Sequence, residues 1–278
     1  MVRRAAVAGT WYPGSARALA GELDVYLDRA TGLDGDLVAL IAPHAGLRYS
    51  GPVAARSYRL LRDRPIDLVV LVGPSHFAGF DGVAVHPGDG FETPLGTSPI
   101  DREAVAALVD AEPAIVRDAS VHEREHSLEM QLPFIQHVSP GAAIVPLLVG
   151  FQTADTASVL ADALVRVFAG RPRTVLVASS DLSHYHDAAT ASRLDGVVLD
   201  CLARFDADAL QQALDRNPGH ACGGGPMVAV LRAAARLGAR DARVLAHADS
   251  GDVSGDKRAV VGYAAAAFGR FADQDTGR

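Results

Sequence analysis

The chain has 278 residues, of which 49% are hydrophobic, and its formal net charge is −7. This length and apolar content suit one large α/β domain with a full core and exclude a disordered chain. The 26 lysine and arginine residues are scattered along the sequence. The chain therefore lacks the basic field that favours nucleic-acid binding, and we expect no nucleic-acid partner.

Cysteine content and the length of the apolar runs indicate the compartment. Two cysteines, Cys201 and Cys222, are too few for a disulfide framework. The start of the chain, MVRRAAVAGTWYPG, has an apolar stretch too short for a signal peptide. No segment approaches the roughly 20 apolar residues of a membrane helix. We expect a cytoplasmic protein that does not associate with a membrane.

Apolar runs and segments of helical period alternate along the chain. In chain order we predict a helix over 15–30, a strand over 37–42, a helix over 52–62, a strand over 68–73, short strands and turns over 80–99, helices over 101–111 and 127–138, a strand over 143–150, a helix over 155–168, a strand over 174–178, helices over 187–204 and 226–237, and strands over 243–248 and 259–266.

This alternation predicts an α/β fold. The runs LVVLVG and IVPLLVG are apolar without interruption, which indicates strands covered on both faces. We therefore expect a three-layer α/β/α sandwich with a mostly parallel or mixed central sheet. A single domain over residues 1–270, followed by a polar tail over 271–278, is the simplest organisation.

Three of the predicted strands end in a histidine or an acid. His44 follows one apolar run, His76 follows the next, and Asp181 and His184 follow TVLVASS. The carboxyl ends of strands in an open α/β sheet meet in one crevice. Each histidine could instead simply be hydrogen-bonded in its loop. Paired imidazoles suit zinc, copper, iron or nickel, so together they favour a metal or catalytic site.

Cys222, in HACGGGP, is a candidate third metal ligand. The three glycines permit close approach of the backbone, and Pro226 suits the first turn of a helix. A thiol at a helix amino terminus has a favoured thiolate. The alternative is a small core residue, which is the interpretation that we give to Cys201.

The segment SSDLSHYH suggests acid–base chemistry. Asp181 and His184 are three residues apart, so their side chains can project in similar directions. A carboxylate beside an imidazole can orient its tautomer, and His184 is then a candidate general base with Asp181 as its partner. The alternative is that Asp181 caps the following helix, although the neighbouring serines could do the same.

The segment HEREHSLEMQLPF superficially resembles the zinc helix of a metalloprotease. The order H-E-x-x-H is absent, however, because the chain reads His122, Glu123, Arg124, Glu125 and His126. A zinc-protease assignment therefore fails. His126 and Glu129 are candidates to face the crevice.

Eight motifs in this order resemble the Memo family, over residues 4–268: GTWYPG, IAPHAGLRYSG, GPSHF, TPLG, EHSLEMQLPF, VPLLVG, SSDLSHY and CGGGP. Bacterial and archaeal members are labelled component B of the AmmeMemoRadiSam system. The family is similar to class III extradiol (LigB-type) dioxygenases, so the resemblance implies a LigB-like sandwich with its metal at the strand ends. The residues that it implies are His44, His76 and Cys222 as metal ligands, Asp181 and His184 in the base region, and Trp11 and Tyr49 near the pocket.

The implied ligand set has a cysteine where the dioxygenases have a carboxylate. Thiolate favours copper(I) or zinc, whereas the imidazoles also accept iron(II), and the resemblance favours iron or copper. The leading hypothesis is a dioxygenase-like oxidoreductase with a redox-active mononuclear site and an unknown small-molecule or peptide substrate.

Two other functions use the same pocket. A non-catalytic scaffold could bind a peptide or a partner protein, with Arg48 as the best candidate to contact a phosphate. A zinc-dependent hydrolase could use a metal-bound water with His184 as the base. The name of the system also implies association with a radical-SAM enzyme and a third small protein.

Overall fold

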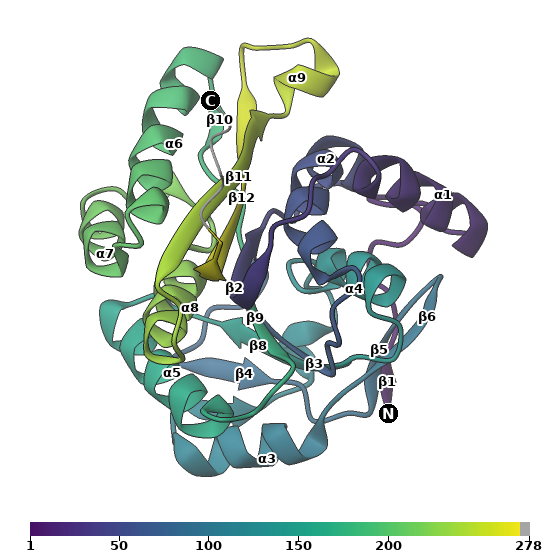
Figure 1. Ribbon diagram of the computed structural model, residues 1–278, viewed down its shortest axis with the longest axis vertical. Helices are drawn as coiled ribbons and strands as arrows, with labels where there is room; N and C mark the ends of the chain where they lie inside the picture. Colours follow the sequence, from purple (N-terminus) through teal and green to yellow (C-terminus); the bar gives the residue numbers. More distant parts are fainter. Residues whose placement is uncertain (273–278) are drawn as a thin grey trace.

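A computed structural model describes residues 1–272 of the chain (Figure 1). Within these residues, a nine-stranded mixed sheet forms the centre of the molecule. Its strands, in spatial order, are β10 (His184–His186), β12 (Val260–Phe271), β2 (Gly35–Ala42), β9 (Thr174–Ser179), β3 (Leu68–Pro74), β8 (Ala143–Val149), β4 (Val83–Val85) and β7 (Ile115–Arg117), and β11 (Asp241–Asp249) also pairs with β12. The neighbours β2, β9, β3 and β8 are parallel, and antiparallel strands border them on both sides.

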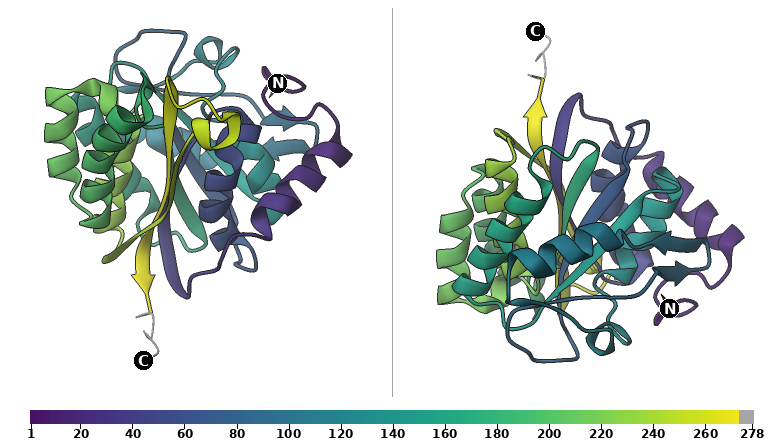
Figure 2. Two further views of the ribbon diagram at one scale, coloured as in Figure 1. Left: turned by 90° about the horizontal axis from the view of Figure 1, so that it is seen from above. Right: turned by 90° about the horizontal axis from the view of Figure 1, so that it is seen from below.

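Helices cover both faces of this sheet (Figure 2). One layer contains α1 (Ala16–Leu27), α2 (Leu47–Tyr58) and α4 (Leu132–Val138), together with a small sheet of β1 (Val2–Arg3), β5 (Gly90–Thr93) and β6 (Gly96–Pro99). The other layer contains α5 (Ala154–Phe168), α6 (Ala188–Ala203), α7 (Ala207–Arg216) and α8 (Gly224–Arg236), with α3 (Arg102–Ala111) beside α5. A short helix, α9 (Gly251–Ser254), joins β11 to β12. The predicted three-layer α/β/α sandwich is confirmed.

Four short 3-10 helices complete the elements of the described residues: η1 (Arg59–Leu61), η2 (Ser120–His122), η3 (Glu129–Gln131) and η4 (Pro218–His220). No helix in the described part of the chain is long and apolar enough to cross a membrane. Most of the predicted polar tail, residues 273–278, lies outside the described residues, and β12 continues through Phe271.

The central strands form because their sequences can be buried on both sides. All seven residues of β3 are buried, and β8 is buried from its second residue onward. β3 pairs in parallel with β8 on one side and with β9 on the other. All six strands predicted from apolar runs are present, with ends that differ by a few residues.

The helices differ more from the prediction. The helix expected over 52–62 begins at Leu47, whose amide donates to the carbonyl of Trp11, so Pro52 lies inside the helix. The helix expected over 127–138 is α-helical only from Leu132. The helix α7 was not predicted, although the Asp206 carboxylate caps it by accepting a hydrogen bond from the Ala209 amide.

The order of the central strands determines what meets at their carboxyl ends. β9 lies between β2 and β3, so the strands that precede His44 and His76 are not direct neighbours. The residues that follow β9, beginning at Ser180, lie between the two histidine loops. The crevice is therefore formed by three consecutive parallel strands.

Candidate metal centre

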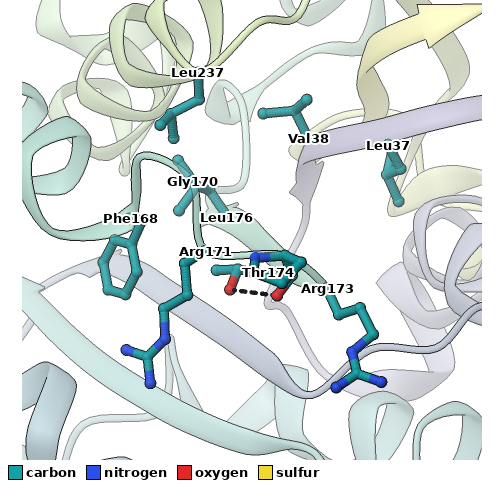
Figure 3. Close-up of a pocket in the computed structure, with 10 residues that line it drawn as sticks. Leu37, Val38, Phe168, Gly170, Arg171, Arg173, Thr174, Leu176 and Leu237 are labelled. Atoms are coloured by element: carbon teal, nitrogen blue, oxygen red, sulfur yellow. Dashed lines mark hydrogen bonds between the residues drawn. The ribbon is translucent and has the colours of Figure 1, made fainter.

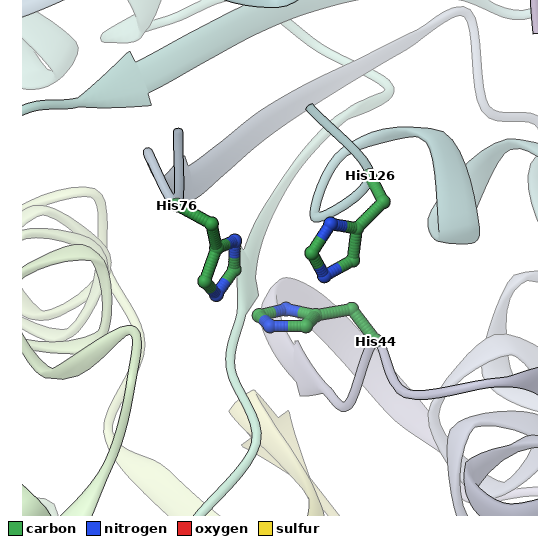
Figure 4. A group of neighbouring side chains, drawn as sticks. All are labelled: His44, His76 and His126. Atoms are coloured by element: carbon green, nitrogen blue, oxygen red, sulfur yellow. The ribbon is translucent and has the colours of Figure 1, made fainter. Parts of the chain in front are cut away.

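Three histidines from separate loops converge at this edge of the sheet (Figure 4). His44 follows β2, His76 follows β3, and His126 lies between η2 and η3. One ring nitrogen from each can be chosen so that all three lie within 4.8 Å of one another. The rings of His76 and His126 are stacked at 4.5 Å, and the ring of His44 meets both edge-on. This grouping could hold a metal ion.

The three imidazoles differ in their exposure. His44 is 2% exposed and His126 is 8% exposed, whereas 27% of the His76 side chain is accessible. Burial lowers the pKa of His126 to about 4 and holds the pKa of His44 well below its usual range. Both rings are therefore neutral near pH 7, which is the state that a metal ligand requires.

The hydrogen bonds of His44 define its tautomer. The Ser179 hydroxyl donates to the carbonyl of Ser127 at 2.7 Å, so at 2.9 Å from His44 Nδ1 it must accept. The Nδ1 atom of His44 therefore carries the hydrogen, and the lone pair is on Nε2. Cys222 Sγ lies 3.2 Å from that Nε2 atom. The structure thus brings the predicted ligands His44 and Cys222 into contact.

Asp181 joins the loop of His44 to that of Cys222. Its Oδ1 atom accepts hydrogen bonds from the amides of His44, at 2.7 Å, and Ala45, at 3.3 Å. The Asp181 amide donates to Cys222 Sγ, and the Cys222 amide donates to the Asp181 carbonyl. Gly223 permits this arrangement, because a Cβ atom there would lie 2.5 Å from the Ser179 carbonyl oxygen.

Burial dominates the electrostatics of this pair. It raises the pKa of Asp181 to about 7, although the amides of His44 and Ala45 act in the opposite direction. Burial also raises the pKa of the Cys222 thiol, and the nearby Asp181 carboxylate adds to the increase. The expectation of a favoured thiolate thus does not hold for the metal-free protein, in which Cys222 carries its proton.

Glu125 holds the loops of His76 and His126 together. Its Oε1 atom accepts hydrogen bonds from the amides of His126 and Ser127, both at 2.8 Å, and lies 2.9 Å from His76 Nδ1. Its Oε2 atom accepts from the His76 amide. Burial would raise the pKa of Glu125, but these donors outweigh it and lower the pKa to about 2. The sequence motifs had not indicated a role for this residue.

Glu129, the acid that the sequence suggested for the crevice, instead anchors the amino-terminal segment. It is fully buried, and it accepts hydrogen bonds from the Arg3 guanidinium at 2.6 Å and the Tyr12 hydroxyl at 2.7 Å. The amides of Ala6 and Val7 also donate to it. An acid with a buried cation as its partner is satisfied without a ligand, so Glu129 acts on the site only through this segment.

The anchored segment places an aromatic side chain against the site. The Trp11 ring lies 4.3 Å from the His126 ring, and Trp11 is 38% exposed. Tyr49, the other predicted pocket aromatic, lies on the first turn of α2 beside Gly46 and under the Arg48 guanidinium. Trp11 therefore borders the histidine cluster directly, whereas Tyr49 lies beside Gly46, two residues after His44.

His184 is held independently of Asp181. Its Nδ1 atom lies 2.8 Å from the Leu182 carbonyl, to which it must donate, and this leaves the Nε2 lone pair free. Burial lowers the pKa of His184, and the nearby His76 contributes. The expected hydrogen-bonded pair of Asp181 and His184 is not formed, because the Asp181 side chain turns toward the amides of the His44 loop.

Cavities also lie outside the histidine cluster. One of about 210 Å³ adjoins Cys222 and is bordered by Gln152, Gln211 and Gly225. Another of about 410 Å³ lies at the opposite end of the sheet, where β2 and β9 begin (Figure 3). Its two arginines, Arg171 and Arg173, are each paired with an aspartate.

The fold and the histidine cluster define an α/β protein with a candidate metal site at the strand ends of a mixed sheet. The model of the family described as "Memo-like protein" matches residues 3–267. The chain therefore belongs to the Memo family, as its motifs predicted.

Proteins from bacteria and archaea show the same relationship. A "MEMO1 family protein" of Thermotoga petrophila is 36% identical over 96% of this chain and 99% of its own length. One from Methanosarcina mazei is 37% identical over 95% of this chain and 98% of its own length. The crystal structure of uncharacterized protein JW3007 from Escherichia coli K12 superposes with a TM-score of 0.54 at 17% identity, covering 82% of this chain and 99% of that one. This last likeness shows a shared fold alone.

Proposed function

We propose that the chain is a mononuclear metal protein in which His44, His76 and Cys222 bind iron or copper. One observation carries the proposal: Cys222 Sγ lies 3.2 Å from His44 Nε2, and His44 belongs to a cluster in which nitrogens of His44, His76 and His126 lie within 4.8 Å of one another. Such spacing is compatible with bonds of about 2.0–2.3 Å from several donors to one ion.

The chemistry of the donors supports this choice of metal. Imidazole accepts iron, copper and zinc, and thiolate adds a preference for soft ions such as copper(I). A bound iron or copper ion would supply one-electron chemistry to an oxidoreductase. The lone pair of His44 Nε2 is already directed to the site, but the Cys222 thiol must lose its proton before its sulfur can bind.

His184 is suited to act as the general base. Because its Nδ1–H donates to the Leu182 carbonyl, its Nε2 atom is free to accept a proton from a small-molecule or peptide substrate. Its lowered pKa keeps the ring neutral near pH 7. Asp181 supports the site by fixing the loops of His44 and Cys222, and it does not orient His184.

Anaerobic reconstitution with iron(II), copper(I) or zinc(II), followed by elemental analysis, tests the proposal. Wild type and the control His186→Ala, which changes an exposed histidine outside the cluster, should each bind one ion per chain. Since changes outside the ligands already cost about 10–100-fold in affinity, His44→Ala should lower the affinity for the ion by at least about tenfold, and with it the metal content.

Equal metal content in wild type and His44→Ala would contradict the proposed ligand set. Uptake of zinc alone, with no iron or copper, would instead favour the zinc-dependent hydrolase. In that case the ion would activate a water molecule and would not exchange electrons.

A further inference from the structure

The Glu125 carboxylate lies between the loops of His76 and His126, and it is not one of the proposed metal ligands. It is 2% exposed, and its Oε1 atom accepts hydrogen bonds from the amides of His126 and Ser127. Its Oε2 atom accepts from the amide of His76. Backbone amides can only donate, so both carboxylate oxygens serve as acceptors.

This arrangement determines the state of the His76 ring. Oε1 lies 2.9 Å from His76 Nδ1 and already accepts two amide hydrogens, so His76 must be the donor in this contact. The Nδ1 atom therefore carries the hydrogen, and the Nε2 lone pair faces away from Glu125. A carboxylate that accepts from Nδ1 also makes the imidazole a stronger electron donor.

The other histidine of the proposed ligand pair has a neutral partner. His44 Nδ1 donates to the hydroxyl of Ser179 at 2.9 Å, and that hydroxyl donates onward to the Ser127 carbonyl. The Ser179 oxygen also accepts from the Gln131 amide group at 2.8 Å. His44 and His76 thus have the same tautomer but differ in the charge beside Nδ1.

We infer that Glu125 is a positioning residue of the metal site, which fixes the His76 ring and makes His76 a stronger donor than His44. This inference rests on the proposed function. The carboxylate places a negative charge one imidazole away from the ion. A bound copper or iron ion is then stabilised in its higher oxidation state, and its reduction potential is lowered.

Copper-loaded full-length protein provides the test. Glu125→Gln removes the charge at nearly constant size. Glu125→Asp keeps the charge, but its shorter side chain moves the carboxylate away from His76. Ser179→Ala is the matched control, because it removes the neutral partner of His44. The two measurements are copper(I) affinity, by competition with a chromophoric chelator, and the reduction potential of bound copper, by spectroelectrochemistry.

We expect Glu125→Gln to weaken copper binding by about 10–100-fold and to raise the reduction potential. Glu125→Asp should weaken binding but leave the potential closer to that of wild type, because the charge remains. Ser179→Ala should change the potential less than Glu125→Gln does. A wild-type affinity and potential in Glu125→Gln, or an equal rise in potential in Ser179→Ala, would overturn the inference.

A measurement on metal-free wild type keeps the inference testable if Glu125→Gln fails to fold or if the protein binds no copper. Nitrogen-15 NMR of the imidazoles should show His76 protonated at Nδ1, with its proton resonance downfield of that of His44. A His76 ring protonated only at Nε2 would overturn the role of Glu125. Absence of both copper and iron uptake, with the expected spectrum, would instead refute the proposed function and leave the tautomer assignment intact.

Discussion

The candidate metal centre has two halves, each built around one buried carboxylate. Asp181 holds the loops of His44 and Cys222, and Glu125 holds those of His76 and His126. Each half thus contributes two candidate donors from segments that are distant in the sequence.

The two carboxylates differ in their hydrogen bonds and in their ionisation. Asp181 accepts from two backbone amides, and burial raises its pKa to about 7. Glu125 accepts from three backbone amides and one imidazole, and its pKa falls to about 2 although it is also buried. Glu125 has more N–H donors than Asp181, and together they outweigh the effect of burial on its pKa.

Removing each carboxylate in turn should give the largest difference between the halves. Glu125→Ala leaves four donors without an acceptor and should lower the free energy of unfolding by about 3–5 kcal/mol. Asp181→Ala leaves two and should cost about 1–3 kcal/mol. Urea unfolding of the metal-free proteins measures both values. Equal losses of unfolding free energy would contradict the comparison, because the additional donors of Glu125 would then contribute nothing to stability.

Two buried histidines outside both halves, His86 and His122, should make the unfolding free energy sensitive to acid. Burial lowers the pKa of His122 to about 3 and that of His86 to about 4. The unfolded chain binds these protons below about pH 6.5, and the folded chain does not until pH falls to those values. Each ring therefore lowers the free energy of unfolding by about 1.4 kcal/mol for every unit that the pH falls across this window.

His122→Phe should remove one of these contributions. Between pH 6 and pH 4, the unfolding free energy of the metal-free variant should fall less steeply than that of wild type, by about 1.4 kcal/mol per pH unit. Comparing slopes cancels any constant effect of the larger ring. If the unfolding free energies of the two proteins fall in parallel, the loss of stability at low pH arises from other groups, such as the histidines of the candidate metal centre.

The smallest expected effect concerns backbone strain beside His184, on the Asp181 side of the site. Tyr185 has φ 60°, in the left-handed region, and is 77% exposed. Asparagine tolerates this conformation better, so Tyr185→Asn should raise the free energy of unfolding by about 0.5–1 kcal/mol. Tyr185→Phe keeps the strain and serves as the control in the same urea titration. A gain of equal size in both variants would exclude strain as the cause.

The fold was more predictable than its helix boundaries. Uninterrupted apolar runs such as 68–73 are typical of strands covered on both faces, and they indicated the sandwich. The start of α2 was not predictable from Pro52, because it depends on a hydrogen bond from Leu47 to Trp11, 36 positions earlier in the chain. The helix α7 is short, and its cap at Asp206 was the available signal.

The site was predictable where it follows the strand-end rule and less so elsewhere. His44, His76 and Asp181 directly follow central strands, and the glycines after Cys222 mark its close approach. The choice between Glu125 and Glu129 could not be made from their spacing, because the segment before Leu132 is not α-helical. The partner of Glu129, Arg3, lies 126 positions away, and no local pattern reveals it.

The order of β2, β9 and β3 has a consequence for the folding of the chain. Candidate donors at positions 44, 76, 126 and 222 belong to segments separated by long stretches of sequence. An ion bound by several of them would act as a cross-link that closes large loops, and its binding free energy would add to the stability of the whole sheet. Metal supply would then influence how long the protein survives in the cell.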